Sequence, residues 1–288
     1  MDQIQTEEML STIPRYKESA HAFSHVLHNL VLGNSQARQA ADLFHGTWLG
    51  HPLHAVLTDL TIGAWVLGTL FDFLGLFTRS KTTQRAADRM ISMGNASAVP
   101  TALAGITDFS TIPHRATATG ATHGLLNTVG LALNLLSARE RKSGRQGSGV
   151  FLSTITSSLL LVTAWLGGEL SYRYRIGVDK TGNPSGPEDW QPVMNDEDLV
   201  ENQPVRVEAG GFPVLLYRHA GGIYAIGAVC GHEGGPLEKG SFNDLRVTCP
   251  WHQSVYDLKD GGVVHGPTVY AEPRFQVRVQ NGKVEVKR

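Results

Sequence analysis

The sequence predicts a two-domain protein in which an N-terminal four-helix transmembrane bundle is followed by a small antiparallel β domain. Three observations predict this fold class. The chain has 288 residues, enough for two modest domains. Its first part, up to about residue 175, contains four long apolar stretches, and its last part contains short runs that alternate between apolar and polar residues. The formal net charge of −1 gives no reason to expect a nucleic-acid partner.

Residues 1–45 precede the apolar stretches and are predicted to form a helical segment that lies on the membrane surface or caps the bundle. The extreme N-terminus is acidic and no apolar run follows it, so a cleaved signal peptide is not expected. Three histidines recur at helical spacing on one face, namely His21, His25 and His28. The stripe could bind a metal ion, and a half-polar helix face is the simpler interpretation.

The four apolar stretches are each long enough to cross a bilayer as a helix. They are Leu53–Phe77, Met90–Phe109, Gly120–Ser137 and Val150–Tyr172. Small residues within them permit close helix packing, although Asn95 and Pro100 make the second stretch less apolar. We therefore predict a four-helix transmembrane domain over residues 46–175. A soluble bundle is the alternative, but the runs SSLLLVTAWLGG and GAWVLGTLFDFLGLF lack the polar face of a water-exposed helix.

A segment rich in Gly, Pro and Asp predicts a linker over residues 176–195. Residues 196–288 then contain short alternating runs, including VRVEA, GIYAI, FQVRV and KVEVKR. Asn281-Gly282, between the last two runs, is a strong signal for a hairpin turn. These features predict an all-β domain.

Both cysteines of the chain lie in this β domain, and each has a histidine close by. The pattern is Cys230-x-His232, sixteen residues, then Cys249-x-x-His252. Thiolate and imidazole suit zinc as well as iron–sulfur chemistry, and a disulfide between the two cysteines is a further alternative. A zinc finger places its cysteines in one half of the motif and its histidines in the other. Here each half supplies one of each, which fits a [2Fe–2S] cluster with two cysteines on one iron and two histidines on the other.

With these motifs, residues 190–288 resemble the Rieske iron–sulfur family. The Cys-Gly-His and Cys-Pro-Trp-His sequences stand at the family spacing, and Gly266-Pro267 stands where the family has a third, proline-containing loop. The resemblance implies that Cys230 and Cys249 hold the inner iron. It also implies that His232 and His252 hold the outer iron, at a solvent-facing edge where an electron partner docks.

Ser254 and Tyr256 occupy positions where high-potential members of the family place hydroxyl groups that hydrogen-bond to sulfur. Such donors stabilise the reduced cluster, and histidine ligands can couple electron uptake to a proton. The chain lacks the additional cysteine pair of those members and in this respect resembles the ferredoxin-type Rieske proteins that feed oxygenases. An oxygenase catalytic subunit is not expected, because the additional domain is predicted to be membrane helices. His265 is predicted to be a surface residue.

The start of the first apolar stretch, Gly50-His51-Pro52-Leu53-His54, resembles the signature of an uncharacterised family of four-helix bacterial membrane proteins. The similarity covers residues 40–175 and implies the fold rather than a role. Four alternating spans would bring a set of ionisable residues to the membrane side that the β domain occupies. The set comprises His51, His54, His123 and Asp108. The three histidines could be axial ligands of a haem, bind a quinone, or hydrogen-bond within the bundle.

Basic residues gather in two of the links between the stretches. The first link has Arg79, Lys81, Arg85 and Arg89, the third has Arg139, Arg141, Lys142 and Arg145, and the second has only Arg115. The positive-inside rule predicts that the two basic links are cytoplasmic, so that the β domain lies on the outer side of a bacterial cell membrane. Assembly of clusters in the cytoplasm argues for the opposite orientation.

We predict a membrane-anchored Rieske protein that carries one electron at a time between a membrane or soluble donor and an acceptor, and that can couple a proton to the electron. Its partners would be redox proteins or a quinone, with lipid around the helices. One alternative is a quinol-oxidising or haem-containing oxidoreductase subunit. Another is a redox-sensing or anchoring subunit.

Overall fold

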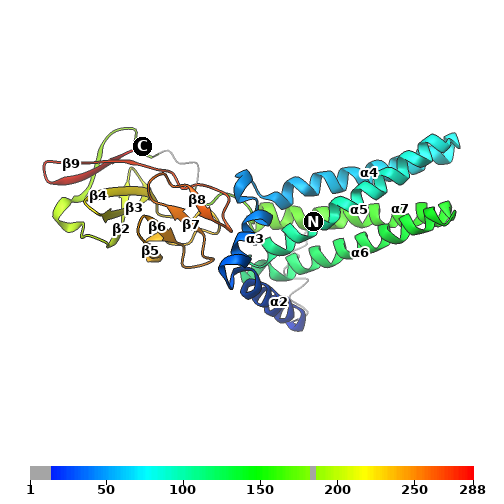
Figure 1. Ribbon diagram of the computed structural model, residues 1–288, viewed down its shortest axis with the longest axis horizontal. Coiled ribbons are helices and arrows are strands. Elements are labelled where there is room, and N and C mark those ends of the chain that lie inside the picture. The colour runs from blue at the N-terminus through cyan, green and yellow to red at the C-terminus, as the bar shows by residue number, and fades with distance from the viewer. Residues whose placement is uncertain (1–13, 182–185) are drawn as a thin grey trace, which may run out of the picture. The chain divides into compact units, whose positions relative to one another are not determined.

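The computed structural model describes residues 14–181 and 186–288. These residues form two compact units, each described here by itself (Figure 1). The helical unit contains the described residues up to Val31 together with Leu53–Ile176, and the β-rich unit contains Leu32–Pro52 and Gly177–Arg288. The chain therefore passes from one unit to the other more than once, because a short N-terminal segment belongs to the β-rich unit.

Helices occur where the four apolar stretches predict them. The unit consists of α2 (Pro14–Leu32), α4 (Leu53–Thr78), α5 (Lys81–Phe109), α6 (Thr117–Lys142) and α7 (Gln146–Gly168), which continues into a π-helical turn (Glu169–Arg173). Ser80 begins α5 by accepting a hydrogen bond from the Thr83 amide, as an N-cap residue does. The short links between α4 and α5 and between α6 and α7 make two antiparallel hairpins.

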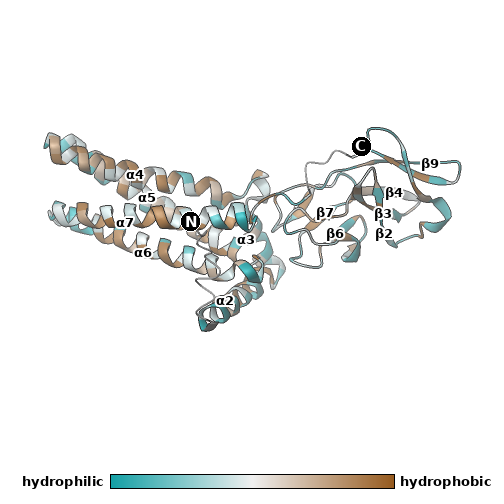
Figure 2. Cartoon of the chain, turned by 180° about the vertical axis from the view of Figure 1, so that it is seen from behind, coloured by the Kyte–Doolittle hydropathy of each residue, from teal (hydrophilic) through white to brown (hydrophobic). Residues whose placement is uncertain are grey.

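Two of these helices are long and apolar enough to cross a membrane, within the part of the chain that the structure describes. They are α4 and the continuous helix Gln146–Arg173. Large apolar side chains on them face outward, including Phe77 at 86% exposure and Leu161 at 76%. Much of α4 and α7 is accordingly coloured as apolar in Figure 2. Helices α5 and α6 form as predicted, but they are not among the helices that are apolar enough to be candidate membrane spans.

The lower hydropathy of α5 and α6 has a physical cause in the centre of the bundle. Their buried positions include the polar residues Asn95, Ser97 and Asn134. Trp65 on α4 donates from its indole nitrogen to Oδ1 of Asn95 at 3.0 Å, and Asn95 donates to the Asn134 carbonyl at 3.1 Å. A hydropathy average counts these inward-facing groups as if they faced the surroundings.

The predicted all-β domain is confirmed as a set of three antiparallel sheets. Their strand orders are β1-β10-β9, β2-β3-β4 and β5-β6-β7-β8. The strands are β1 (Gln191–Asn195), β2 (Pro204–Ala209), β3 (Phe212–His219), β4 (Gly222–Gly227), β5 (Ser241–Asn243), β6 (Arg246–Thr248), β7 (Val255–Asp257), β8 (Val263–His265), β9 (Gln276–Gln280) and β10 (Lys283–Lys287). The hairpin at Asn281-Gly282 is present, and both residues have positive φ, as a type I′ turn requires.

Strand β3 lies between two hydrophobic cores, because successive side chains of a strand point to opposite faces. Leu215 and Tyr217 belong to one core, which also contains both cysteines. Val214 and Leu216 belong to the other, which β10 helps to fill. Both cysteines therefore belong to the core that packs on one face of β3.

Of residues 1–45, predicted as one interfacial segment, residues 1–13 lie outside the described residues, and residues 14–45 are divided between the two units. Helix α2 packs on the bundle, where His28 Nδ1 lies 3.2 Å from the Ser110 carbonyl and the His21 ring lies 4.1 Å from that of His114. His21 and His25 are exposed, and His28 is half-buried. Helix α3 (Ser35–His45) and the 3-10 turn Thr47–Leu49 belong instead to the β-rich unit.

Candidate metal centre

The four predicted ligands stand on two loops with the same backbone hydrogen bonds. One loop, residues 230–235, follows β4, and the other, residues 249–254, follows β6. In each loop the cysteine N–H donates to the carbonyl five residues later, and the N–H four residues later donates back to the cysteine carbonyl, at 2.8–3.1 Å. The residue four positions after the cysteine has positive φ in both loops, Gly234 at 82° and Gln253 at 63°. Two equivalent turns therefore present one cysteine and one histidine each.

The structure brings the four side chains together with the sulfur atoms inside and the imidazoles further out. Cys230 and Cys249 are 1% and 2% exposed and form no disulfide. The half-buried rings of His232 and His252 have centroids 4.9 Å apart and lie nearly perpendicular to each other. The structure therefore does not support a disulfide between Cys230 and Cys249.

The local environment favours the metal-binding protonation states of Cys249 and His232 but not that of Cys230. A hydrogen bond shared between the two sulfur atoms lowers the pKa of Cys249 to about 7 and raises the pKa of Cys230 well above its usual range. Burial, with a smaller contribution from the charge of His252, holds the pKa of His232 well below its usual range. A ready thiolate and a neutral imidazole are the forms that coordinate a metal ion.

The donor set fits two metal ions better than one. Among the described residues no three His, Cys, Asp or Glu side chains converge on a single ion, which a tetrahedral zinc site would require. Gly235 leaves room beside the sulfur, because a Cβ there would lie 2.7 Å from Sγ of Cys249. Two cysteines behind two histidines match a [2Fe–2S] cluster, in which each iron takes two protein ligands.

Tyr256 is fully buried behind the first loop. Its hydroxyl oxygen accepts from the Gly231 amide at 3.1 Å and lies 3.2 Å from Sγ of Cys230. The hydroxyl carries one hydrogen, which it can donate to this sulfur or to the nearby carboxyl group of Glu272. Ser254 is also fully buried. Its Oγ accepts a hydrogen bond from the Thr268 amide of the third loop at 3.2 Å.

Sequence reasoning missed a buried carboxyl group at the same place. Glu272 is 2% exposed, and its Oε1 accepts from the Gly231 amide, between the two ligands of the first loop, at 2.9 Å. Burial raises the pKa of Glu272 well above its usual range, with a further contribution from the charge of Cys230. The carboxyl lies 41 positions from Gly231, and no local pattern announces such a contact.

Helix α3, from the N-terminal part of the sequence, contacts the third loop. Asp42 accepts from the Gly266 amide with Oδ1 at 2.7 Å, and its Oδ2 lies 2.7 Å from Nδ1 of His265. Arg38 donates to the side chain of Gln253 in the second loop. His45 is 2% exposed and lies against Gly266. His265, predicted to be a surface residue, is half-buried and paired with Asp42.

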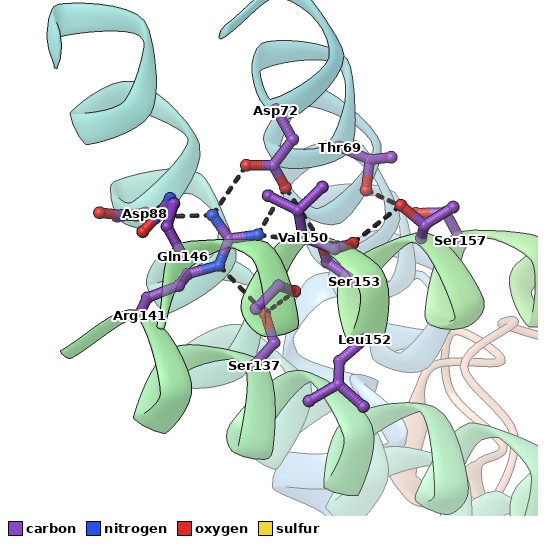
Figure 3. Close-up of polar contacts among 12 residues, drawn as sticks. Thr69, Asp72, Asp88, Ser137, Arg141, Gln146, Val150, Leu152, Ser153 and Ser157 are labelled. Carbon is purple, nitrogen blue, oxygen red and sulfur yellow. Dashed lines mark hydrogen bonds and ion pairs between the residues drawn. The ribbon is translucent and has the colours of Figure 1, made fainter. Parts of the chain in front are cut away.

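The three histidines predicted near the membrane are placed differently from one another. His51 is exposed, with Nδ1 3.4 Å from the Pro52 carbonyl. His54 and His123 lie on α4 and α6 with ring centroids 6.4 Å apart. Asp72 on α4 is buried in an ion pair with Arg141 (Figure 3).

Comparison with known proteins identifies the two parts of the chain. Residues 189–279 match the family model described as Rieske [2Fe-2S] domain. This part of the chain is a Rieske domain. Residues 50–180 match the family described as predicted membrane protein (DUF2231). The Rieske domain implies a [2Fe–2S] cluster, and the donor set described above fits one.

The curated relatives share the Rieske part. The ferredoxin subunit of anthranilate 1,2-dioxygenase from Burkholderia cepacia is 28% identical over 98 residues, which are 34% of this chain and 91% of that protein. Apoptosis-inducing factor 3 from Mus musculus is 35% identical over 95 residues, 33% of this chain, and the match spans 16% of its own length. The ferredoxin of carbazole 1,9a-dioxygenase from Nocardioides aromaticivorans IC177 is 25% identical, with a TM-score of 0.33, over 34% of this chain and 96% of that chain.

Replacing Tyr256 by Phe is expected to lower the midpoint potential of the Rieske cluster by roughly 40–80 mV, the equivalent of one hydrogen bond in a one-electron couple. The hydroxyl near Sγ of Cys230 stabilises the reduced, more negative state, and the variant lacks it. Potentiometric titration followed by EPR measures the shift. Tyr224→Phe is the matched control, because Tyr224 packs on the same core without a bond to sulfur. An unchanged or raised potential in Tyr256→Phe would contradict this role.

Proposed function

We propose that the protein is a membrane-anchored one-electron carrier whose Rieske domain, over residues 196–288, holds its cluster with Cys230, Cys249, His232 and His252. The observation that carries the proposal is the pair of equivalent loops, each of which presents one buried cysteine and one outer histidine. When bound, the [2Fe–2S] cluster supplies a one-electron couple whose potential is raised by the two histidine ligands.

The side chains around the cluster site have two different roles in such a carrier. The cysteines, Tyr256 and Glu272 lie on the buried side and exclude water from the sulfur atoms. The imidazoles lie on the outer side, and Trp251 beside His252 is 52% exposed. An exposed aromatic ring next to a ligand suits the docking of a redox partner. We place the electron exchange at this edge, with a donor and an acceptor that are redox proteins or a quinone.

The helical domain over residues 46–175 acts as the membrane anchor in this proposal, with all four helices α4 to α7 crossing the bilayer. The outward apolar side chains of α4 and α7 support this, since a water-facing helix would carry polar residues there. The buried Asn95 of α5 pairs within the bundle, with the Trp65 indole and the Asn134 carbonyl, as a membrane interior demands of polar groups. The predicted linker, residues 176–195, joins the anchor to the carrier, and its last five residues form β1, which pairs with β10.

The distribution of basic residues sets the proposed orientation. The α4–α5 and α6–α7 links are basic, whereas the α5–α6 link contains Arg115 alone. The positive-inside rule puts the basic links in the cytoplasm of a bacterial cell. The Rieske domain, which follows α7, would then lie on the outer side of the membrane.

Membrane vesicles of the two orientations test these points together. Vesicles washed with carbonate are reduced, treated with ferricyanide, which does not cross the membrane, and frozen for EPR. The reduced Rieske signal is expected in the washed pellet, and ferricyanide should remove it at once in right-side-out vesicles but only after detergent in inverted ones. Loss in inverted vesicles alone would reverse the orientation. Absence of the signal from washed membranes would contradict a membrane-anchored carrier.

A further inference from the structure

The helical domain is an internal repeat of two hairpins. The first observation is a constant shift of 69 positions between buried residues of α4 and α6. The matching pairs are Thr61 with Gly130, Trp65 with Asn134, Gly68 with Ser137 and Asp72 with Arg141. A second constant shift relates α5 to α7. Its buried pairs are Ala87 with Gly149, Ile91 with Ser153, Gly94 with Thr156, Ala98 with Leu160 and Ala104 with Leu166.

Equivalent residues of the two halves meet each other at both ends of this repeat. At one end Asp72 and Arg141 form the buried ion pair of Figure 3. Eighteen positions earlier on each helix, about 27 Å away, stand His54 and His123. Asp72 and Arg141 attract each other because their charges are opposite. Two histidines at equivalent positions carry no such attraction and need another reason to face each other.

Both histidines are oriented in the same way by their own hairpin. Nδ1 of His54 lies 2.9 Å from the Thr101 carbonyl on α5, and Nδ1 of His123 lies 3.0 Å from the Thr163 carbonyl on α7. Metal-binding histidines commonly donate one ring N–H to a backbone carbonyl in this way, which makes the other nitrogen the ligand. Here that nitrogen is Nε2 in both halves. In His123 it accepts from Asn127 at 3.2 Å, and metal coordination would replace this bond while Asn127 keeps its bond to the His123 carbonyl.

One turn further along each partner helix, a glycine makes room for the ring. A Cβ at Gly105 would lie 2.8 Å from Cε1 of His54, and a Cβ at Gly167 would lie 3.3 Å from Cε1 of His123. The motif Thr-x-x-x-Gly therefore supplies the carbonyl and the space in both hairpins, as TALAG and TAWLG. A repeated arrangement of donor, acceptor and space indicates a built site.

The spacing of the rings fits a metal ion between them. Two imidazoles bound to opposite sides of one ion, with bonds of about 2.0 Å, have centroids roughly 6.3 Å apart. The centroids of His54 and His123 are 6.4 Å apart and their planes are at 81°. No third His, Cys, Asp or Glu of the described residues joins them, so an ion that needs three or four protein ligands is not suited.

We propose that His54 and His123 are the two axial ligands of one haem, held between the hairpins of the DUF2231 domain. A haem iron takes four ligands from its porphyrin and two from the protein, on opposite faces. Neutral imidazoles and an apolar porphyrin suit helices that are embedded in lipid. The haem is non-covalent, since both cysteines of the chain lie in the Rieske domain. This inference does not depend on the proposed function of the Rieske domain.

The test is the haem content of the full-length protein, purified in detergent from cells supplied with δ-aminolevulinic acid. A pyridine haemochromogen assay is expected to give one haem per chain, with the optical bands of a low-spin, six-coordinate iron. His54→Ala and His123→Ala should each lose the haem. His51→Ala is the control for a histidine at the same end, because that side chain is exposed.

A glycine pair tests the site without removing a ligand. Gly105→Ala should reduce haem content because its Cβ displaces the ring of His54, whereas Gly124→Ala, beside His123, has nothing within 4 Å and should keep it. The Rieske EPR signal in every variant reports that the chain has folded, and it separates this proposal from that of the carrier. Wild-type protein that contains no haem and does not bind added haemin in a titration would overturn the inference, as would haem retained in both histidine variants.

Discussion

Cys249→Ser is expected to abolish the Rieske cluster. Anaerobically purified variant should lack the visible absorption of the oxidised cluster and the EPR signal of the reduced one. Serine would offer a hydroxyl whose proton is not lost near neutral pH, at a site where the thiol pKa is lowered to about 7. The side chain is 2% exposed, so water cannot easily replace the missing ligand. Absorption and EPR spectra measured on equal amounts of folded protein check this result.

The control for this change lies next to it in the chain. Thr248→Ser alters the neighbouring half-buried side chain and leaves both loops with their ligands. It should keep the full spectrum. A normal cluster spectrum in Cys249→Ser would remove Cys249 from the ligand set and with it the equivalence of the two loops.

Asp72→Ala is expected to destabilise the helical domain by about 3–5 kcal/mol, because it leaves the buried Arg141 guanidinium without its main counter-charge. The pair is bidentate, at 2.7 and 2.5 Å, and both side chains are almost fully buried. Ser137 and Ser153 hydrogen-bond to the same guanidinium (Figure 3) and cannot replace the charge. Unfolding of the detergent-solubilised protein, followed by helical circular dichroism, measures the loss.

Asp88→Ala is the matched control, because Asp88 contacts the same guanidinium at 3.0 Å but is 42% exposed. Its removal should cost about 0–1 kcal/mol, as for an exposed ion pair. The double variant Asp72→Ala/Arg141→Leu should be more stable than Asp72→Ala alone, since no uncompensated charge remains. Equal losses for Asp72→Ala and Asp88→Ala would show that the buried pair is not what stabilises this end of the bundle.

The sequence predicts local features of this protein well where one short pattern carries the information. The alternating runs and Asn281-Gly282 predict the β domain and its last hairpin, because a two-residue turn and a period of two are local properties. The Cys-x-His and Cys-x-x-His spacings predict the side chains that the two loops bring together. The backbone hydrogen bonds of each loop join residues within six consecutive positions, so a short sequence pattern is enough to specify the loop's geometry.

Features that depend on contacts between distant residues could not be predicted. Asp42 and Gly266 are 224 positions apart, and nothing near Asp42 indicates that α3 packs on the third loop rather than on the bundle. Glu272 looks like an ordinary charged residue until its burial is known. The hydropathy of α5 misleads for the same reason, since the Asn95 side chain finds its partners, Trp65 and the Asn134 carbonyl, only in the folded bundle.

This chain is expected to hold one [2Fe–2S] cluster on two cysteines and two histidines. Metal and acid-labile sulfide analysis of anaerobically purified protein, together with EPR after dithionite reduction, measures this. We expect two irons and two sulfides per Rieske domain and the rhombic EPR signal of a mixed cysteine–histidine cluster. Zinc in place of iron, or iron with the EPR signal of an all-cysteine cluster, would contradict it.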